Sequence, residues 1–138
     1  MSLSDYGSAL VTGASSGIGT ALVRALTERG VKTYALARRR KRLDALAAET
    51  GCTPLVVDLR DKEEIDRALS ELDVDILINN AGILRDKSFK KMTLDEWDIV
   101  INVHLNGSAY VSWHVWPIMY EKNYGRILFT SSVSGILG

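Results

Sequence analysis

Cysteine, net charge and long hydrophobic runs are all scarce in this sequence, and each scarcity excludes a class of protein. Cys52 is the single cysteine and has no partner for an internal disulfide, which favours a reducing compartment over secretion. The 17 basic and 17 acidic side chains leave no net charge to attract nucleic acid or an anionic membrane. The chain has no 18-residue apolar run and no basic start before an apolar stretch, so neither a membrane span nor a signal peptide is expected. These absences predict a soluble, cytoplasmic protein.

What is present is an alternation of apolar runs and helical patterns over 138 residues, the size of a single domain covering 1–138. The patterns predict strands over 8–13, 31–37, 53–59, 74–82 and 125–131, and helices over 17–30, 41–50, 62–72 and 93–120. Because these strands are apolar throughout, they indicate a parallel sheet covered by helices on both faces. The prediction is an α/β protein with a three-layer Rossmann fold, a doubly wound sheet of about five strands in the order 3-2-1-4-5.

A glycine-rich turn, "TGASSGIG", joins the first predicted strand to the first predicted helix. Gly13 would permit the tight turn, Gly17 the close approach of a ligand, and Gly19 the packing of the helix against the strand. The N–H groups at the start of the helix and the hydroxyls of Ser15 and Ser16 are donors suited to a pyrophosphate. A glycine turn without a ligand is the alternative, but the flanking strand and helix favour a dinucleotide site.

The residues after the second predicted strand bear on the identity of the dinucleotide. NAD-binding domains usually place an acid there for the ribose 2′-hydroxyl, whereas this chain has Arg38 at the head of the run "RRRKR". Arginines can grip a 2′-phosphate that an acid would repel, so NADP(H) is favoured, NAD(H) is possible, and Arg38 is the expected contact. The run could instead be a solvated charge cluster or a nucleic-acid patch, although overall neutrality weighs against the last. Asp58, which ends the third strand, could meet the adenine edge or serve as a turn residue.

Two further motifs, "NNAG" at 79–82 and "SSVSG" at 131–135, follow the glycine-rich turn in order. With all three in place, the chain resembles the short-chain dehydrogenase/reductase family over its whole length. The resemblance implies hydride transfer between a nicotinamide and a carbonyl or alcohol carbon, with no metal. The expected cofactor contacts, from the residues and the resemblance together, are Gly13, Ser15, Ser16, Gly17, Ile18, Gly19, Arg38, Asp58, Leu59, Asn80, Ala81 and Gly82.

The resemblance also implies a catalytic serine at Ser132, with Ser131 as the less favoured neighbour. The family's helix asparagine falls on His104, which could act in a proton relay or be a satisfied core residue. The family's Tyr-x-x-x-Lys pair would lie beyond Ser132, and no tyrosine of this chain has a lysine four positions later. The chain is therefore expected to lack the family's last strands, to be the cofactor-binding part of an oxidoreductase, and to be catalytically incompetent alone.

The second half of the chain has a more specific resemblance. It is similar to the 3-hydroxyacyl-CoA dehydrogenase units of peroxisomal multifunctional enzymes and to 3-oxoacyl-carrier-protein reductases, which suggests an acyl thioester substrate. All three tryptophans, both phenylalanines and both histidines follow Gly82, which fits a chimera of two sources. A non-catalytic or engineered nucleotide-binding fragment, and one part of a two-part enzyme, are the alternatives that stay open.

The predicted helix over 93–120 is apolar on nearly every side, with Val103, Trp113 and Trp116 among its apolar residues. A helix of this kind requires partners around it, and in the family it packs across a subunit interface, so a homo-oligomer is expected. Pro117 removes one intrahelical hydrogen bond and is expected to kink or end the helix. The last strand is expected to be an unprotected sheet edge.

Overall fold

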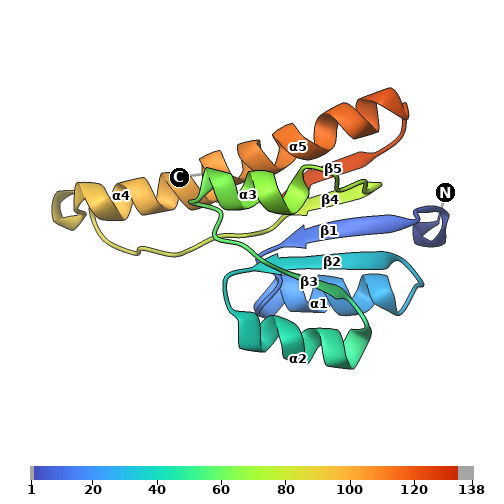
Figure 1. Cartoon of the computed structure of the whole chain (residues 1–138). Helices are drawn as coiled ribbons and strands as arrows, with labels where there is room; N and C mark the ends of the chain where they lie inside the picture. The colour runs from blue at the N-terminus through green and yellow to red at the C-terminus, as the bar shows by residue number, and fades with distance from the viewer. Residues whose placement is uncertain (1, 134–138) are drawn as a thin grey trace.

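The computed structural model describes residues 2–133, which form one parallel sheet flanked by helices (Figure 1). The strands are β1 (Ser8–Thr12), β2 (Lys32–Ala37), β3 (Thr53–Val56), β4 (Ile76–Asn79) and β5 (Arg126–Phe129). Their order is β3-β2-β1-β4-β5, and every neighbouring pair is parallel. The predicted fold class and strand order are therefore confirmed.

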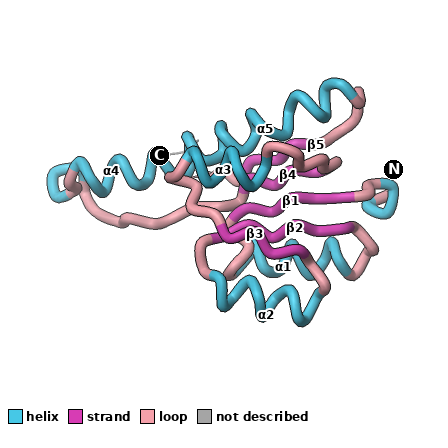
Figure 2. Tube along the Cα trace, in the orientation of Figure 1, coloured by secondary structure: helices cyan, strands magenta, loops and turns pink. Residues whose placement is uncertain are grey.

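Helices cover both faces of the sheet, as Figure 2 shows. They are α1 (Gly17–Thr27), α2 (Arg40–Thr50), α3 (Lys62–Leu69), α4 (Leu94–Ile101) and α5 (Gly107–Glu121), with helical turns η1 (Leu3–Asp5), η2 (Phe89–Lys91) and η3 (Asn102–Asn106). Successive strand residues point to opposite faces, so Val11 and Ala35 pack under α1 and α2, whereas Leu10 and Leu36 pack under α3 and α5. All four of these side chains are fully buried, and the sheet is the middle of three layers.

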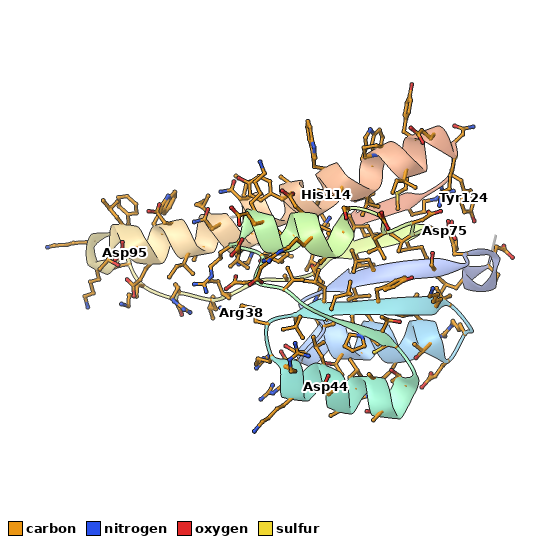
Figure 3. The ribbon with its side chains drawn as sticks, in the orientation of Figure 1. Arg38, Asp44, Asp75, Asp95, His114 and Tyr124 are labelled. Atoms are coloured by element: carbon orange, nitrogen blue, oxygen red, sulfur yellow. The ribbon has the colours of Figure 1, made fainter. Side chains whose placement is uncertain are left out.

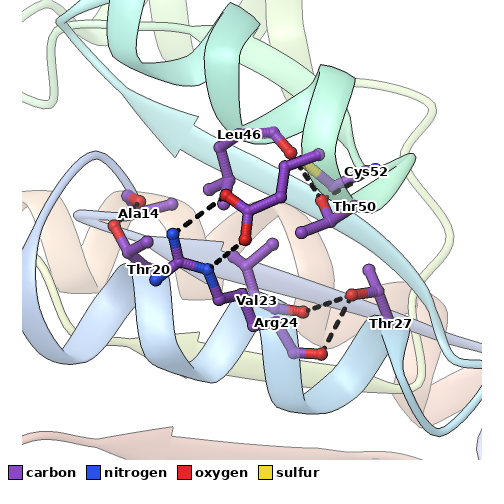
Figure 4. Close-up of polar contacts among 9 residues, drawn as sticks. Ala14, Thr20, Val23, Arg24, Thr27, Leu46, Thr50 and Cys52 are labelled. Carbon is purple, nitrogen blue, oxygen red and sulfur yellow. Dashed lines mark hydrogen bonds and ion pairs between the residues drawn. The ribbon is translucent and has the colours of Figure 1, made fainter.

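The pair α1 and α2 shows what holds a helix layer together (Figure 4). Arg24 donates from Nε to Glu49 Oε1 at 2.6 Å and from Nη2 to Glu49 Oε2 at 2.9 Å. Both side chains are about half exposed, so this ion pair adds little to stability. Val23 and Leu46, from the same two helices, are buried in the core beneath the pair, and their burial is the larger contribution.

The amino ends of the strands are tied together by Asp75, which Figure 3 labels beside Tyr124. Its Oδ2 accepts a hydrogen bond from Gly7 N at 2.8 Å, and its Oδ1 accepts one from Lys122 Nζ at 2.9 Å. Partial burial by itself would raise the pKa of Asp75, but hydrogen bonds from the Lys122 ammonium and from backbone N–H groups outweigh it and lower the pKa. Tyr124 stacks on Tyr6 beside this cluster, with ring centroids 5.5 Å apart.

The region predicted as one helix over 93–120 begins as expected but is not regular. Thr93 Oγ1 accepts a hydrogen bond from Glu96 N at 3.2 Å, and Glu96 Oε2 accepts one from Thr93 N at 3.0 Å. This capping box starts α4, which extends away from the sheet at the left of Figure 1. The π-helical turn η3 then lies between α4 and α5, and the backbone stays helical from Leu94 to Glu121, so the predicted long helix is present but is not regular.

Pro117 does not end α5, which continues to Glu121. The proline is exposed, and its missing N–H removes one intrahelical hydrogen bond without ending the helix. Beyond the proline, Met119 is buried against the sheet and fixes the last turn. The packing of Met119 thus keeps α5 helical beyond a residue that usually ends a helix.

Within residues 2–133, none of the helices has the length and apolar character that crossing a membrane requires.

Candidate nucleotide-binding site

A cavity of about 510 Å³ opens at the carboxyl ends of β1 to β4, where the strand order reverses between β1 and β4. Doubly wound sheets bind their ligands at this position. The lining residues are Gly13, Ser15, Ser16, Ile18, Leu36, Ala37, Arg38, Arg39, Val57, Asp58, Leu59, Asn80, Ala81, Gly82, Ile83 and Val103. All of the predicted cofactor contacts except Gly17 and Gly19 are among them. The structure therefore brings these distant segments together, and their contact with a cofactor stays a prediction.

Thr12 joins the glycine turn to the segment after β4. Its Oγ1 accepts hydrogen bonds from the backbone N–H groups of Asn80 and Ala81, both at 3.0 Å. Asn80 in turn donates from Nδ2 to the carbonyl of Thr12 at 3.1 Å. The threonine is 1% exposed, so these bonds form without competition from water. They fix the position of one wall of the cavity relative to the other.

Two glycines allow the backbone segments at this junction to approach closely. Gly13 has a φ of +66°, and a Cβ there would lie 2.7 Å from Ala81 Cα. A Cβ at Gly19 would lie 2.2 Å from the carbonyl oxygen of Gly13, so any side chain would force the strand and helix apart. Gly17 differs, because a Cβ there would meet nothing within 4 Å although its φ is +55°. The space beside Gly17 at the start of α1 is therefore open.

The serines of the turn are held by an arginine that follows β2. Arg39 donates from Nε to Ser15 Oγ at 3.0 Å and from Nη2 to Ser16 Oγ at 2.7 Å. Ser16 occupies the N-cap position of α1 without a capping hydrogen bond from its side chain. Arg38 also lines the cavity and forms no ion pair within the described part of the chain. Sequence reasoning selected Arg38 from the basic run and missed Arg39.

Asp58 is the one carboxylate among the lining residues of this cavity. Arg60 donates from Nε to Asp58 Oδ1 at 3.0 Å and from Nη2 to Asp58 Oδ2 at 2.6 Å. The hydrogen bond from Arg60 lowers the pKa of Asp58, and the positive charge of Arg38 adds to the effect. The carboxylate therefore stays ionised and is already paired beside the cavity.

Leu36, Ala37, Val57 and Val103 give the cavity an apolar wall that the candidate residues did not include. All four are buried, with exposed fractions of 8% or less. Three of them come from β2 or from just beyond β3, so their positions at predicted strand ends could have identified them from the sequence as lining residues. An apolar wall beside a few polar donors is typical of cofactor sites.

His104 lies against Gly82, a lining residue of the cavity, but is not itself among the lining residues. It is exposed, so the interpretation of His104 as a core residue is wrong. A Cβ at Gly82 would lie 2.8 Å from His104 Cε1, and the glycine therefore makes room for the imidazole. His104 Nε2 is 3.0 Å from Ile83 N and 2.8 Å from Ile83 O. One ring nitrogen either donates or accepts, so it can serve only one of these groups at a time.

Ser132 and Ser131 follow β5 and are exposed. Neither lines the cavity, so the structure does not place the predicted catalytic serine with the cofactor residues. Gly135, the last residue of the serine motif, lies outside the described residues. Over residues 2–133 no group of three or more His, Cys, Asp or Glu side chains is arranged to hold a metal ion.

The comparisons with known proteins agree with this geometry. The family model for short chain dehydrogenases matches residues 8–138. Mouse peroxisomal multifunctional enzyme type 2 is 38% identical over 145 residues, covering 94% of this chain and 20% of that protein. The acetoacetyl-CoA reductase of Shinella zoogloeoides is 38% identical over 136 residues, covering 94% of this chain and 56% of that protein.

Among solved structures, a short-chain dehydrogenase from Sphingobium yanoikuyae in complex with NADPH matches with a TM-score of 0.86. It is 32% identical, and the match covers 94% of this chain and 55% of that one. The present chain thus spans about half the length of several of the proteins that it matches.

Proposed function

Because the chain belongs to the short-chain dehydrogenase/reductase family, we propose that it is the cofactor-binding part of an NADP(H)-dependent oxidoreductase. The complete enzyme would transfer a hydride between the nicotinamide and a carbonyl or alcohol carbon. The observation that carries the proposal is the position of two arginines, Arg38 and Arg39, opposite the glycine turn in one cavity.

Each part of the cavity has a role in this proposal. The open space beside Gly17, with the N–H groups at the start of α1, would receive the pyrophosphate. Arg39 reaches the hydroxyls of Ser15 and Ser16, and this group of donors, with Arg38 nearby, would hold the ribose 2′-phosphate. The NADPH bound to the Sphingobium relative supports the choice of cofactor.

The opposite end of the cavity would receive the nicotinamide. Asn80, Ala81 and Gly82 form this wall, and His104 positions the backbone of Ile83 beside them. Leu59 and Ile18 would contact the cofactor through their apolar atoms. A substrate of the 3-oxoacyl or 3-hydroxyacyl thioester class is supported by the acetoacetyl-CoA reductase relative.

Proton transfer is the part that these 138 residues do not supply. Ser132 would hydrogen-bond the substrate oxygen, but the sequence contains no Tyr-x-x-x-Lys pair to donate the proton. A positioned acid or base contributes on the order of 10²–10⁴-fold to a rate, so the chain alone would show at most trace turnover. Adding a segment that carries the pair in trans would restore activity if the chain is half of a two-part enzyme.

A titration with NADPH and NADH in parallel, followed by nicotinamide fluorescence, tests the proposal. We expect NADPH to bind at least about tenfold more tightly, because each charge-assisted hydrogen bond to the phosphate contributes about 1.5–3 kcal/mol. Arg39→Met should remove most of that difference. Arg29→Met, whose guanidinium bonds to the Ala25 carbonyl away from the cavity, is the matched control. Equal affinity for both nucleotides would contradict NADP(H) specificity, and no binding of either would favour a non-catalytic fragment.

The exposed face of α5 supports self-association. Val111, Val115 and Met119 face the sheet, whereas Trp113, Trp116 and Tyr120 are 78%, 59% and 74% exposed. Aromatic side chains of this size are costly to leave in water and typical of interface centres. We propose that two copies of the chain pair through this face, as closed symmetric dimers do. Light scattering should show a dimer for the wild type and a monomer for Trp116→Lys, and a wild-type monomer at tens of micromolar would refute the pairing.

A further inference from the structure

The single carboxylate that lines the cavity poses an electrostatic problem for the proposed cofactor. Asp58 shares the cavity with Arg38 and Arg39, the two groups proposed to hold a 2′-phosphate. An ionised acid in this place repels a phosphate and attracts the guanidinium groups that the phosphate requires. The charge of Arg38 does act on Asp58, since it helps to lower the pKa of that carboxyl.

Arg60 resolves this conflict by its geometry. Its Nε lies 3.0 Å from Asp58 Oδ1 and 3.1 Å from Oδ2, and its Nη2 lies 2.6 Å from Oδ2. The backbone N–H of Arg60 also donates to Asp58 Oδ1 at 3.0 Å. Both carboxylate oxygens are therefore engaged from the side of Arg60, which is itself absent from the lining of the cavity.

The backbone beneath the pair is fixed independently of Arg60. Glu64 Oε2 accepts a hydrogen bond from Asp58 N at 2.8 Å, and Asp61 caps α3 through bonds from the N–H groups of Glu63 and Glu64. Substituting the exposed Arg60 side chain would therefore remove the three side-chain bonds to the carboxylate, leave the backbone bond to Oδ1, and not move the chain that carries it. The Arg60 side chain is 41% exposed and that of Asp58 is 25% exposed.

We propose that Arg60 is a specificity-determining positioning residue: it holds the Asp58 carboxylate so that Arg38 stays free for a 2′-phosphate. The inference rests on the proposed NADP(H) function and extends it to a residue outside the cavity. Without Arg60, the Asp58 carboxylate turns to Arg38 and competes with the phosphate for the same guanidinium. The loss then falls on phosphorylated ligands and spares ligands without the phosphate.

Two small ligands separate these cases without involving the nicotinamide end. Isothermal titration of the chain with 2′,5′-ADP and with 5′-AMP measures the adenosine site with and without the 2′-phosphate. For Arg60→Met we expect roughly five- to tenfold weaker binding of 2′,5′-ADP, since part of a charge-assisted bond is lost, with 5′-AMP within about twofold. The double variant Asp58→Asn/Arg60→Met should restore the wild-type ratio, because the competing charge is gone.

Arg67→Met is the control, since Arg67 is an exposed arginine of the neighbouring helix α3 that bonds to the Glu63 carbonyl. Arg60→Lys, which keeps the charge but not the paired donors, should give an intermediate ratio. Equal weakening of both ligands, or an unchanged ratio in Arg60→Met, would overturn the inference alone. A wild-type chain that binds the two ligands equally would overturn the NADP(H) proposal and this inference with it.

Discussion

Gly19 is the position where adding one methyl group should cost the most. In Gly19→Ala, the new Cβ would lie 2.2 Å from the Gly13 carbonyl oxygen and 2.8 Å from Asn80 Nδ2. The first of these neighbours is backbone, so relief requires the strand and helix to move apart by roughly 1 Å to reach an ordinary contact. That movement also strains the bonds that join Thr12 to Asn80.

The size of the expected loss in stability depends on whether the atoms beside the new Cβ belong to backbone or to a side chain that can move. Overpacking a core by one methylene typically costs about 1–3 kcal/mol, and a clash with backbone belongs at the upper end because no rotamer change relieves it. For a domain of this size, about 3 kcal/mol lowers the melting temperature by roughly 10 °C. Gly17→Ala is the matched comparison, since its Cβ meets nothing and only the positive φ opposes it, at about 1 kcal/mol.

Urea unfolding followed by circular dichroism would measure both variants. We expect a loss of about 3 kcal/mol in the free energy of unfolding for Gly19→Ala and of about 1 kcal/mol or less for Gly17→Ala. NADPH binding should weaken in both, because a side chain at Gly17 would enter the proposed pyrophosphate space and the movement forced by one at Gly19 would distort it. A Gly19→Ala protein as stable as the wild type would refute the argument that this glycine is required by close packing.

Substitutions at three further positions test other contacts. Thr12→Val should cost about 2–4 kcal/mol of unfolding free energy, because two partly buried backbone N–H groups lose their acceptor, while Thr12→Ser should cost little; equal losses would contradict this. The pKa of Asp75 is lowered in the folded protein. Its contribution to folding stability is therefore present above the ordinary aspartate pKa and is lost as the pH falls through the lowered pKa of the folded state. Asp75→Asn should be about 1 kcal/mol less stable at pH 7, through its weaker bond to Lys122, and should lose less stability than the wild type in acid; parallel pH profiles would refute this. His104→Ala should weaken NADPH binding by about tenfold or less through loss of the bond to Ile83, whereas His104→Asn, with both a donor and an acceptor, should retain affinity.

The fold and most of the cavity could be predicted from local patterns in the sequence. Apolar runs separated by helical spacing specify a parallel sheet, and the position of Gly13 between a strand and a helix places the cavity at the carboxyl edge. The two turns meet because Thr12 ends β1 and Asn80 follows the adjacent strand, β4. Adjacent parallel strands bring their following turns to one edge, so these contacts were within reach of sequence reasoning.

The features that sequence reasoning missed depend on side-chain geometry or on packing. Arg38 and Arg39 are chemically equal in the sequence, and only the direction of each side chain shows that Arg39 reaches the serines. Pro117 is a helix breaker by local rules, but its exposure and the burial of Met119 carry α5 past it. His104 could not be placed as exposed, because the π-helical turn that carries it has no clear local signal.

That turn, η3, also controls what insertions and deletions the chain can accept. The N–H of Gly107 bonds to the carbonyl of Asn102, five residues back, so the turn holds one residue more than an α-helical turn would. Each residue rotates an α-helix by about 100°, so removing one residue between 102 and 106 would rotate α5 by that angle. Val111 would leave the sheet, and the tryptophan face would swing toward it. The one extra residue in η3 therefore determines which face of α5 packs against the sheet.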